Sequence, residues 1–208
     1  MKRFTAVVLV IVCIWCLPAA AATLQVSDSL RLEYTVPEGW QATPAAPEFL
    51  VRQTVEHVSQ HLREEGRAIP VNLDKQVRER LANNELFLFH EKTRAHLDID
   101  FSPIEANENP PQRESVARSA YFAEQELSAE PDVSEVESTT KEFTLSGSEI
   151  AYRIDASFKR DGEPRRFIGV IAFTNRHWLF LYYTGETQSD SDLQQYEELL
   201  KGLAVVAR

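Results

Sequence analysis

The chain has 208 residues and a formal net charge of −10 at pH 7, from 22 Lys and Arg against 32 Asp and Glu. So acidic a chain is a poor partner for nucleic acid or anionic lipid, because both are bound through cationic patches that release counterions. The only sulfur atoms belong to Met1, Cys13 and Cys16, so the rest of the chain has no thiol for catalysis, zinc binding or a disulfide.

Residues 1–22 have the pattern of a secretory signal peptide. Lys2 and Arg3 precede the apolar run 6–17, Pro18 ends the run, and alanines then offer an A-x-A cleavage site. A membrane-spanning helix needs about 20 apolar residues, more than this run supplies, so an uncleaved anchor is the weaker interpretation. We therefore expect a cleaved signal peptide and export to the periplasm.

The processed chain is expected to be a single domain over residues 23–208, without stable membrane insertion. Cys13 and Cys16 form a C-x-x-C pair, but both lie in the apolar core of the signal and would be removed with it. A redox centre is thereby excluded. The sequence contains no P-loop or dinucleotide fingerprint, and we expect no cofactor.

The first half of the processed chain predicts a strand, two helices and a β-hairpin. Alternating apolar residues predict the strand, and apolar residues three and four apart predict the helices, the second of which Asn72 could cap. Two apolar runs around Thr93-Arg94 predict the hairpin. In chain order these elements are the strand 29–40, the helices 51–62 and 73–81, and the strands 85–92 and 95–104.

The second half predicts a helix, a four-stranded meander and a last helix. The meander strands are separated by Ser146-Gly147, Asp161-Gly162 and Asn175-Arg176, which are residue types typical of tight turns. The last two strands are apolar on both faces and have to be covered on both. These elements are the helix 116–127, the strands 135–145, 150–159, 165–174 and 177–185, and a helix from Ser189 to Leu203 with a capping-box-like start at Ser189 and Asp192. The predicted fold class is α+β: an antiparallel sheet with helices on both faces.

Several of these segments together resemble the PsbP-like superfamily, an α/β/α group that includes the periplasmic DcrB-like proteins. The segments are P-E-G-W after the first strand, A-H-L-D-I-D-F before a helix, G-S-E-I-A-Y-R-I-D-A-S-F and W-L-F-L-Y-Y-T-G in the meander, and D-L-Q-Q-Y-E-E-L-L-K-G-L at the end. The stretch 49–81 is longer than the family usually carries. The resemblance implies a non-enzymatic binding or accessory module, and it transfers no catalytic residues.

Two groups of side chains could hold a metal ion. His57 and His61 are four apart on a predicted helix, with Glu64 or Glu65 one turn further along, although a solvent-facing polar flank is the plainer interpretation. The second group is His96, Asp98 and Asp100, which alternate on one strand, with His90 possibly opposite them across the hairpin. The alternative function is therefore a metal-dependent hydrolase that uses this His/Asp cluster.

Three aromatic side chains, Trp40, Tyr152 and Tyr183, are the positions expected to reach a ligand-binding cleft. The function that the sequence favours is a periplasmic, non-enzymatic binding or accessory protein of the cell envelope. It would hold a peptide, a membrane-protein segment or an apolar ligand in a groove between the meander and a helix. The expected partner is thus an envelope protein or an apolar ligand.

Overall fold

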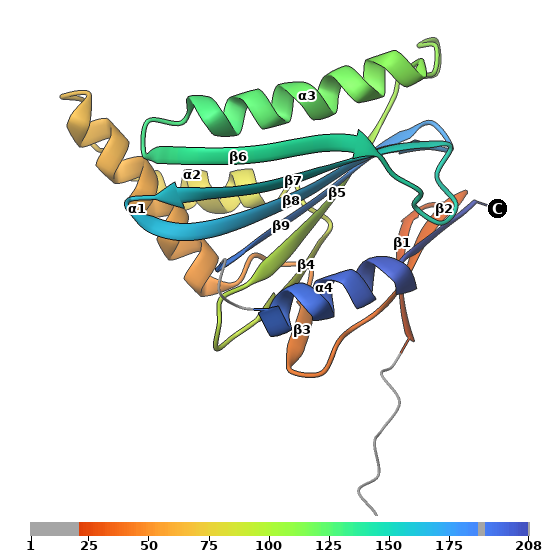
Figure 1. The fold of residues 1–208 in the computed structure, drawn as a ribbon, viewed down its shortest axis with the longest axis horizontal. Helices are drawn as coiled ribbons and strands as arrows, with labels where there is room; N and C mark the ends of the chain where they lie inside the picture. Colours follow the sequence, from red (N-terminus) through yellow and green to blue (C-terminus); the bar gives the residue numbers. More distant parts are fainter. Residues whose placement is uncertain (1–20, 187–189, 208) are drawn as a thin grey trace, which may run out of the picture.

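A computed structural model describes residues 21–186 and 190–207 (Figure 1). Within these ranges the chain forms four helices and ten strands. The helices are α1 (Glu48–Glu64), α2 (Leu73–Leu81), α3 (Arg113–Ala129) and α4 (Asp190–Gly202). The strands are β1 (Ala21–Ser27), β2 (Leu30–Thr35), β3 (Trp40–Thr43), β4 (Leu86–His90), β5 (His96–Pro103), β6 (Val133–Glu142), β7 (Ile150–Arg160), β8 (Glu163–Thr174), β9 (His177–Glu186) and β10 (Ala204–Ala207). The predicted α+β class is confirmed.

Seven strands form one antiparallel sheet in the order β3-β4-β5-β9-β8-β7-β6. The hairpin and the meander predicted from the sequence are both part of it. Asp161 and Gly162 have φ of 53° and 80°, and Asn175 and Arg176 have φ of 42° and 64°. Two consecutive positive φ values define a two-residue type I′ turn, whose twist matches the flanking strands. The local turn chemistry therefore sets the register of the meander.

A second, three-stranded sheet in the order β1-β2-β10 was not predicted. The predicted strand 29–40 corresponds to β2, but β2 pairs with strands from the two ends of the described chain and does not join the larger sheet. Figure 1 shows this small sheet beside α4. It packs its inner residues, among them Leu30 and Leu32, into the main hydrophobic core.

Gly147 fixes the contact between the β6–β7 connection and β10. The amide of Val205 donates to the carbonyl of Ser146 at 2.8 Å. A Cβ atom at Gly147 would lie 1.7 Å from the carbonyl oxygen of Val205, and φ at Gly147 is 80°. Any side chain here would push β10 away, so glycine is required by packing as well as by the turn.

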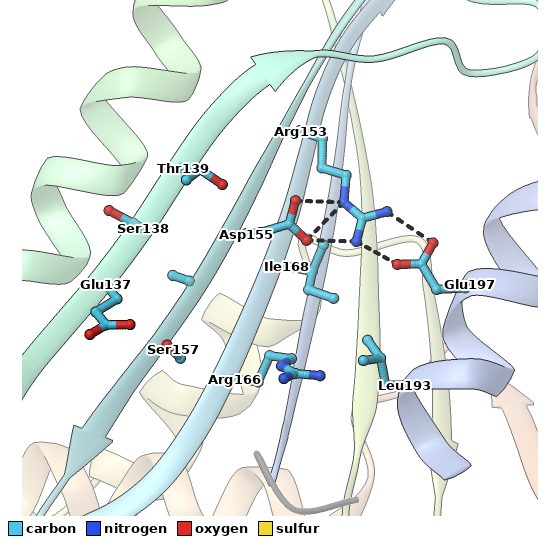
Figure 2. Close-up of a pocket in the computed structure, with 11 residues that line it drawn as sticks. Glu137, Ser138, Thr139, Arg153, Asp155, Ser157, Arg166, Ile168, Leu193 and Glu197 are labelled. Atoms are coloured by element: carbon cyan, nitrogen blue, oxygen red, sulfur yellow. Dashed lines mark hydrogen bonds and ion pairs between the residues drawn. The ribbon is translucent and has the colours of Figure 1, made fainter. Parts of the chain in front are cut away.

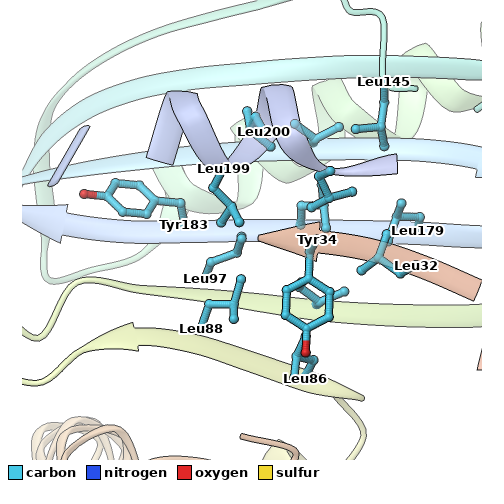
Figure 3. Packing of buried hydrophobic residues seen from close by; sticks show 14 of the residues in the cluster. Leu32, Tyr34, Leu86, Leu88, Leu97, Leu145, Leu179, Tyr183, Leu199 and Leu200 are labelled. Atoms are coloured by element: carbon cyan, nitrogen blue, oxygen red, sulfur yellow. The ribbon is translucent and has the colours of Figure 1, made fainter. Parts of the chain in front are cut away.

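Helices cover both faces of the seven-stranded sheet, as predicted. On one face α4 and the small sheet enclose the largest apolar cluster, with Tyr183 and Leu97 of the sheet under Leu199 and Leu200 of α4 (Figure 3). On the other face α3 places Val116 and Ala120 against β7 and β8. The α1–α2 pair lies over the β4–β5 end of that same face. There Phe49 of α1 contacts the rings of Phe89 and His96, with centroid distances of 5.8 and 6.1 Å.

Two predictions fall partly or wholly on residues outside the described ranges. Of the predicted signal peptide, only Ala21 and Ala22 are described, and they pair with Thr35 and Tyr34 at the start of β1. The helix start at Ser189 lies outside, while Asp192 is a buried residue in the first turn of α4. The helices of the described part include none that is both long and apolar enough to cross a membrane.

The predicted helix cap at Asn72 is wrong in detail. Asn72 precedes α2 as expected, but its side chain makes no capping hydrogen bond to the backbone. Gln76 instead donates to its side-chain oxygen at 3.4 Å.

Candidate functional site

A cleft of about 500 Å³ lies between α4 and strands β6, β7 and β8 (Figure 2). It occupies the part of this sheet face that α4 does not cover. A groove between the meander and a helix is the arrangement that the sequence analysis expects for ligand binding. The lining differs from that expectation because charged and hydroxyl side chains outnumber apolar ones. It consists of Glu137, Ser138, Thr139, Arg153, Asp155, Ala156, Ser157, Arg166, Ile168, Leu193 and Glu197.

Arg153 joins the floor of the cleft to its helical wall. Its side chain is only 10% exposed and contacts two carboxylates, Asp155 of the same strand and Glu197 of α4. Its Nε lies 3.0 Å from both oxygens of Asp155, and its Nη1 donates to Glu197 at 2.9 Å. Burial alone would lower the pKa of the guanidinium, but the hydrogen bonds to Glu197 and Asp155 raise it above its usual value. The guanidinium is therefore fully charged and engaged, and it ties α4 to β7.

Other side chains of the cleft remain available for a ligand. Within the described residues, neither Arg166 nor Glu137 takes part in an ion pair or a side-chain hydrogen bond. Two of the apolar residues that line the cleft are Leu193, which is half-buried, and Ile168, which is only 1% exposed. An apolar centre with charged groups at its rim is suited to binding a chain segment with both kinds of side chain.

None of the three aromatic residues predicted to reach a cleft lines this one, and only two of them lie together. Trp40 and Tyr183 are buried in the core, 6% and 1% exposed, with ring centroids 6.4 Å apart. Tyr183 also stacks on Tyr196 of α4 at 4.5 Å. Tyr152 lies on the opposite face of the sheet, among the residues packed under α3. Ligand binding by these residues stays a prediction.

The predicted His/Asp cluster of the hairpin is divided between the two faces of the sheet. His96, Asp98 and Asp100 are two residues apart along β5, so all three share one face of the sheet. His90 follows Phe89 and points to the other face, where its ring lies 6.3 Å from that of Trp40. The arrangement expected for a metal-dependent hydrolase, with all four side chains converging, is therefore absent from these described residues.

Asp98 is an unusual member of that face. Burial raises its pKa, and the nearby His96 opposes this shift. Its Oδ1 is inaccessible to solvent and has no hydrogen-bond partner in the described structure. The carboxylate form of Asp98 is thus harder to accommodate here than at an exposed position.

His57 and His61 do share one side of α1, as their spacing predicts. Their third neighbour is not Glu64 or Glu65 but Asp132, in the turn between α3 and β6. Sequence reasoning missed Asp132 because it is distant in the chain and stands in no motif with the histidines. It likewise missed Arg153, although an arginine flanked by apolar residues with an aspartate two positions later indicates a paired charge on one strand face.

Comparisons with known proteins place the fold. No protein-family model matches the sequence, and no curated protein matches it. Among solved structures, LpqN, described as involved in cell envelope biogenesis of Mycobacterium tuberculosis, is similar with a TM-score of 0.57 and 10% identity over 91% of this chain and 92% of LpqN. The cyanobacterial PsbP (CyanoP) of Synechocystis sp. PCC 6803 is similar with a TM-score of 0.53 and 10% identity over 93% of this chain and 96% of CyanoP. The chain thus has the PsbP-like fold that its sequence segments resemble.

Proposed function

We propose that this chain is an exported, non-enzymatic binding or accessory protein of the cell envelope. The cleft between α4 and β6–β8 would hold a segment of an envelope polypeptide. The signal-peptide pattern of residues 1–22 supports export. The fold similarity to LpqN, whose description names cell envelope biogenesis, supports the same compartment.

The observation that carries the binding role is the make-up of the cleft. A hydroxyl nucleophile is most often activated by a histidine, and the described lining contains the hydroxyls of Ser138, Thr139 and Ser157 but no histidine. Its one buried cation, Arg153, already has its donors directed at two carboxylates. These features favour holding a partner over transforming a substrate.

The chemistry of the lining favours a polypeptide segment over a purely apolar ligand. Ile168 and Leu193 would contact an apolar side chain, and Arg166 would pair with a carboxylate of the segment. The hydroxyls of Thr139 and Ser157 would hydrogen-bond to its backbone. Glu137 at the rim would disfavour segments with an acidic residue at that end, which adds specificity.

Site-specific crosslinking tests the cleft. A photoreactive amino acid is placed at Ser157 in the cleft, and in a matched control at Ser115, an exposed position on α3. We expect one discrete adduct with an envelope polypeptide from position 157 only, lost when R166E or L193D is added. Equal adducts from both positions, or an adduct that survives both substitutions, would contradict the proposal.

Export is tested separately by the mass of the protein recovered from producing cells. Cleavage after Ala22 gives a species that begins at Thr23 and lacks both cysteines. Full-length protein retained in membranes would contradict export by a cleaved signal.

A further inference from the structure

Three side chains from separate parts of the fold converge beside α1. The rings of His57 and His61 are stacked edge to face with centroids 4.4 Å apart. His57 Nδ1 lies 3.5 Å from Oδ2 of Asp132, and His61 Nε2 lies 3.7 Å from its Oδ1. One donor atom from each residue falls within 4.8 Å of the other two. This His/His/Asp group shares no residue with the cleft of Figure 2.

The carboxylate of Asp132 is buried and lacks hydrogen-bond partners. Its side chain is 6% exposed, and neither of its oxygens accepts a hydrogen bond within the described structure. Arg160 Nε lies 3.0 Å from Oδ2, but this contact is an ion pair without hydrogen-bonding geometry. Buried polar groups are nearly always hydrogen-bonded, and an unsatisfied one costs about 1–3 kcal/mol. A cation bound between the carboxylate and the two imidazoles would remove that cost.

We propose that His57, His61 and Asp132 form a binding site for a divalent transition-metal ion, with Zn²⁺ the preferred metal. Imidazole nitrogen and carboxylate oxygen bind Zn²⁺ at about 2.0–2.2 Å, and a tetrahedron of such bonds has edges of about 3.3 Å. The observed separations of 3.5 and 3.7 Å, one to each oxygen of Asp132, are close to that edge length. The three donor atoms lie within 4.8 Å of one another, so the side chains need to draw together by at most about 1.5 Å to bind the ion. This proposal is independent of the proposed function of the cleft.

The surrounding charges favour a cation. Asp132 and Glu130 supply two negative charges, and Arg160, which pairs with both, supplies one positive charge. The guanidinium also provides the outer contact that orients a ligating carboxylate in many metal sites. Three protein ligands leave a fourth position for water. A cavity of about 600 Å³ with His57 and Arg160 in its lining adjoins the site and gives water access to it.

The ion would act as a clamp between α1 and the turn that leads from α3 into β6. The apolar side of α1, with Val51 at its centre, packs on Val77 of α2. The histidines lie on another side of α1 and are its link to Asp132. Metal binding therefore fixes α1 and its partner helix against the meander.

Metal binding is tested on the full chain with C13S and C16S substitutions, produced without a histidine tag, so that neither thiols nor tag residues bind zinc. Isothermal titration with ZnCl₂ and elemental analysis after dialysis should give one Zn²⁺ per chain. We expect D132N and H61A each to weaken the affinity at least tenfold. H177A, which removes a histidine whose Nδ1 contacts only the backbone carbonyl of Asn175 at 2.8 Å, should leave the affinity unchanged.

The visible spectrum of the Co²⁺ form gives a second readout, because four-coordinate Co²⁺ with imidazole ligands absorbs strongly in the visible region. Circular dichroism checks that each variant is folded, and the partly exposed position of His61 makes H61A the safer variant if D132N unfolds. Absence of zinc binding by the parent chain, or equal binding by the H57A/H61A double variant, would overturn the proposal.

Discussion

Two charged clusters join a helix to the meander, and they differ in whether their hydrogen bonds are made. Arg153 meets Asp155 and Glu197 with well-formed hydrogen bonds on every side (Figure 2). Asp132 is more deeply buried than either of those carboxylates, yet neither of its oxygens accepts a hydrogen bond within the described structure, and its only cationic neighbour there besides the two histidines is Arg160, in an ion pair. The hydrogen bonds of the first cluster are complete within the protein, whereas the carboxylate of the second is left unsatisfied in the described structure.

This difference separates a structural role from a ligand site. A satisfied buried network rigidifies the fold and leaves little capacity for another partner. An unsatisfied buried carboxylate beside two imidazoles can still bind a cation. Until it does, it costs stability, and a bound cation would offset that cost. Disrupting the second cluster should therefore abolish the rise in stability on adding zinc, whereas disrupting the first should leave that rise unchanged.

The largest effect is expected from R153Q. This change leaves Asp155 and Glu197 without their shared cation, and breaking a buried ion pair in this way typically costs about 3–5 kcal/mol. Because the two carboxylates are 32% and 35% exposed, we expect a loss near the lower end, about 3 kcal/mol of unfolding free energy. Urea denaturation of wild type and variant measures the loss, with and without ZnCl₂. A loss below about 1 kcal/mol would show that the first cluster is no more than a surface pair.

Added zinc should stabilise the second cluster by a slightly smaller amount. Free Zn²⁺ at 100 times its dissociation constant raises the unfolding free energy by about 2.7 kcal/mol if it binds only the folded state. Denaturation midpoints with ZnCl₂ and with a chelator measure this rise. The H57A/H61A variant should show none of it, while R153Q should show all of it. The comparison of the clusters fails if R153Q responds to zinc less than wild type does.

D98N is expected to have an intermediate effect that depends on pH. Burial raises the pKa of Asp98 in the folded chain above its unfolded value of about 3.9. The contribution of Asp98 to stability is therefore fully present below the unfolded pKa. It is lost as pH rises through the folded pKa. The unfolding free energy of D98N, relative to that of wild type, should therefore rise between pH 4 and pH 8. The rise should be about 1 kcal/mol at neutral pH. Denaturation curves across this range check the prediction, and a gain that grows toward low pH instead would contradict it.

The parts of the fold that depend on local sequence could be predicted. The meander was predicted because Asp161, Gly162 and Asn175 are residue types that tolerate the positive φ of a tight turn. The small sheet was not: its β1–β2 hairpin around Asp28-Ser29 was missed although the two strands are adjacent in sequence, and its third strand, β10, pairs with β2 from the other end of the described chain. Pairing between distant strands is a property of the whole fold and leaves no local signal.

The candidate sites depend even more than the fold on contacts between distant parts of the chain, which the sequence does not reveal. The spacing of His57 and His61 predicts one helical face, but the identity of their third partner depends on how the turn at Asp132 packs against α1. In β9, Tyr182 and Tyr183 alternate between faces that are equally apolar in sequence. Only the position of α4 shows that Tyr183 is in the core, and its contact with a ligand stays a prediction.

The smallest effect is expected from R78Q, the exposed counterpart of R153Q. Arg78 also binds two carboxylates, with both Nη atoms on Glu48 at 2.7 and 2.9 Å and Nε on Asp74 at 2.9 Å. The geometry matches that of Arg153, but the Arg78 side chain is 44% exposed, so water solvates all the charges whether or not they are paired. We expect a loss of stability far below that of R153Q, and one that disappears in 1 M NaCl, where the Debye length is about 3 Å. Urea denaturation at low and high salt compares the two variants directly. If R78Q and R153Q lost the same stability, burial would not be what distinguishes the charged clusters of this protein.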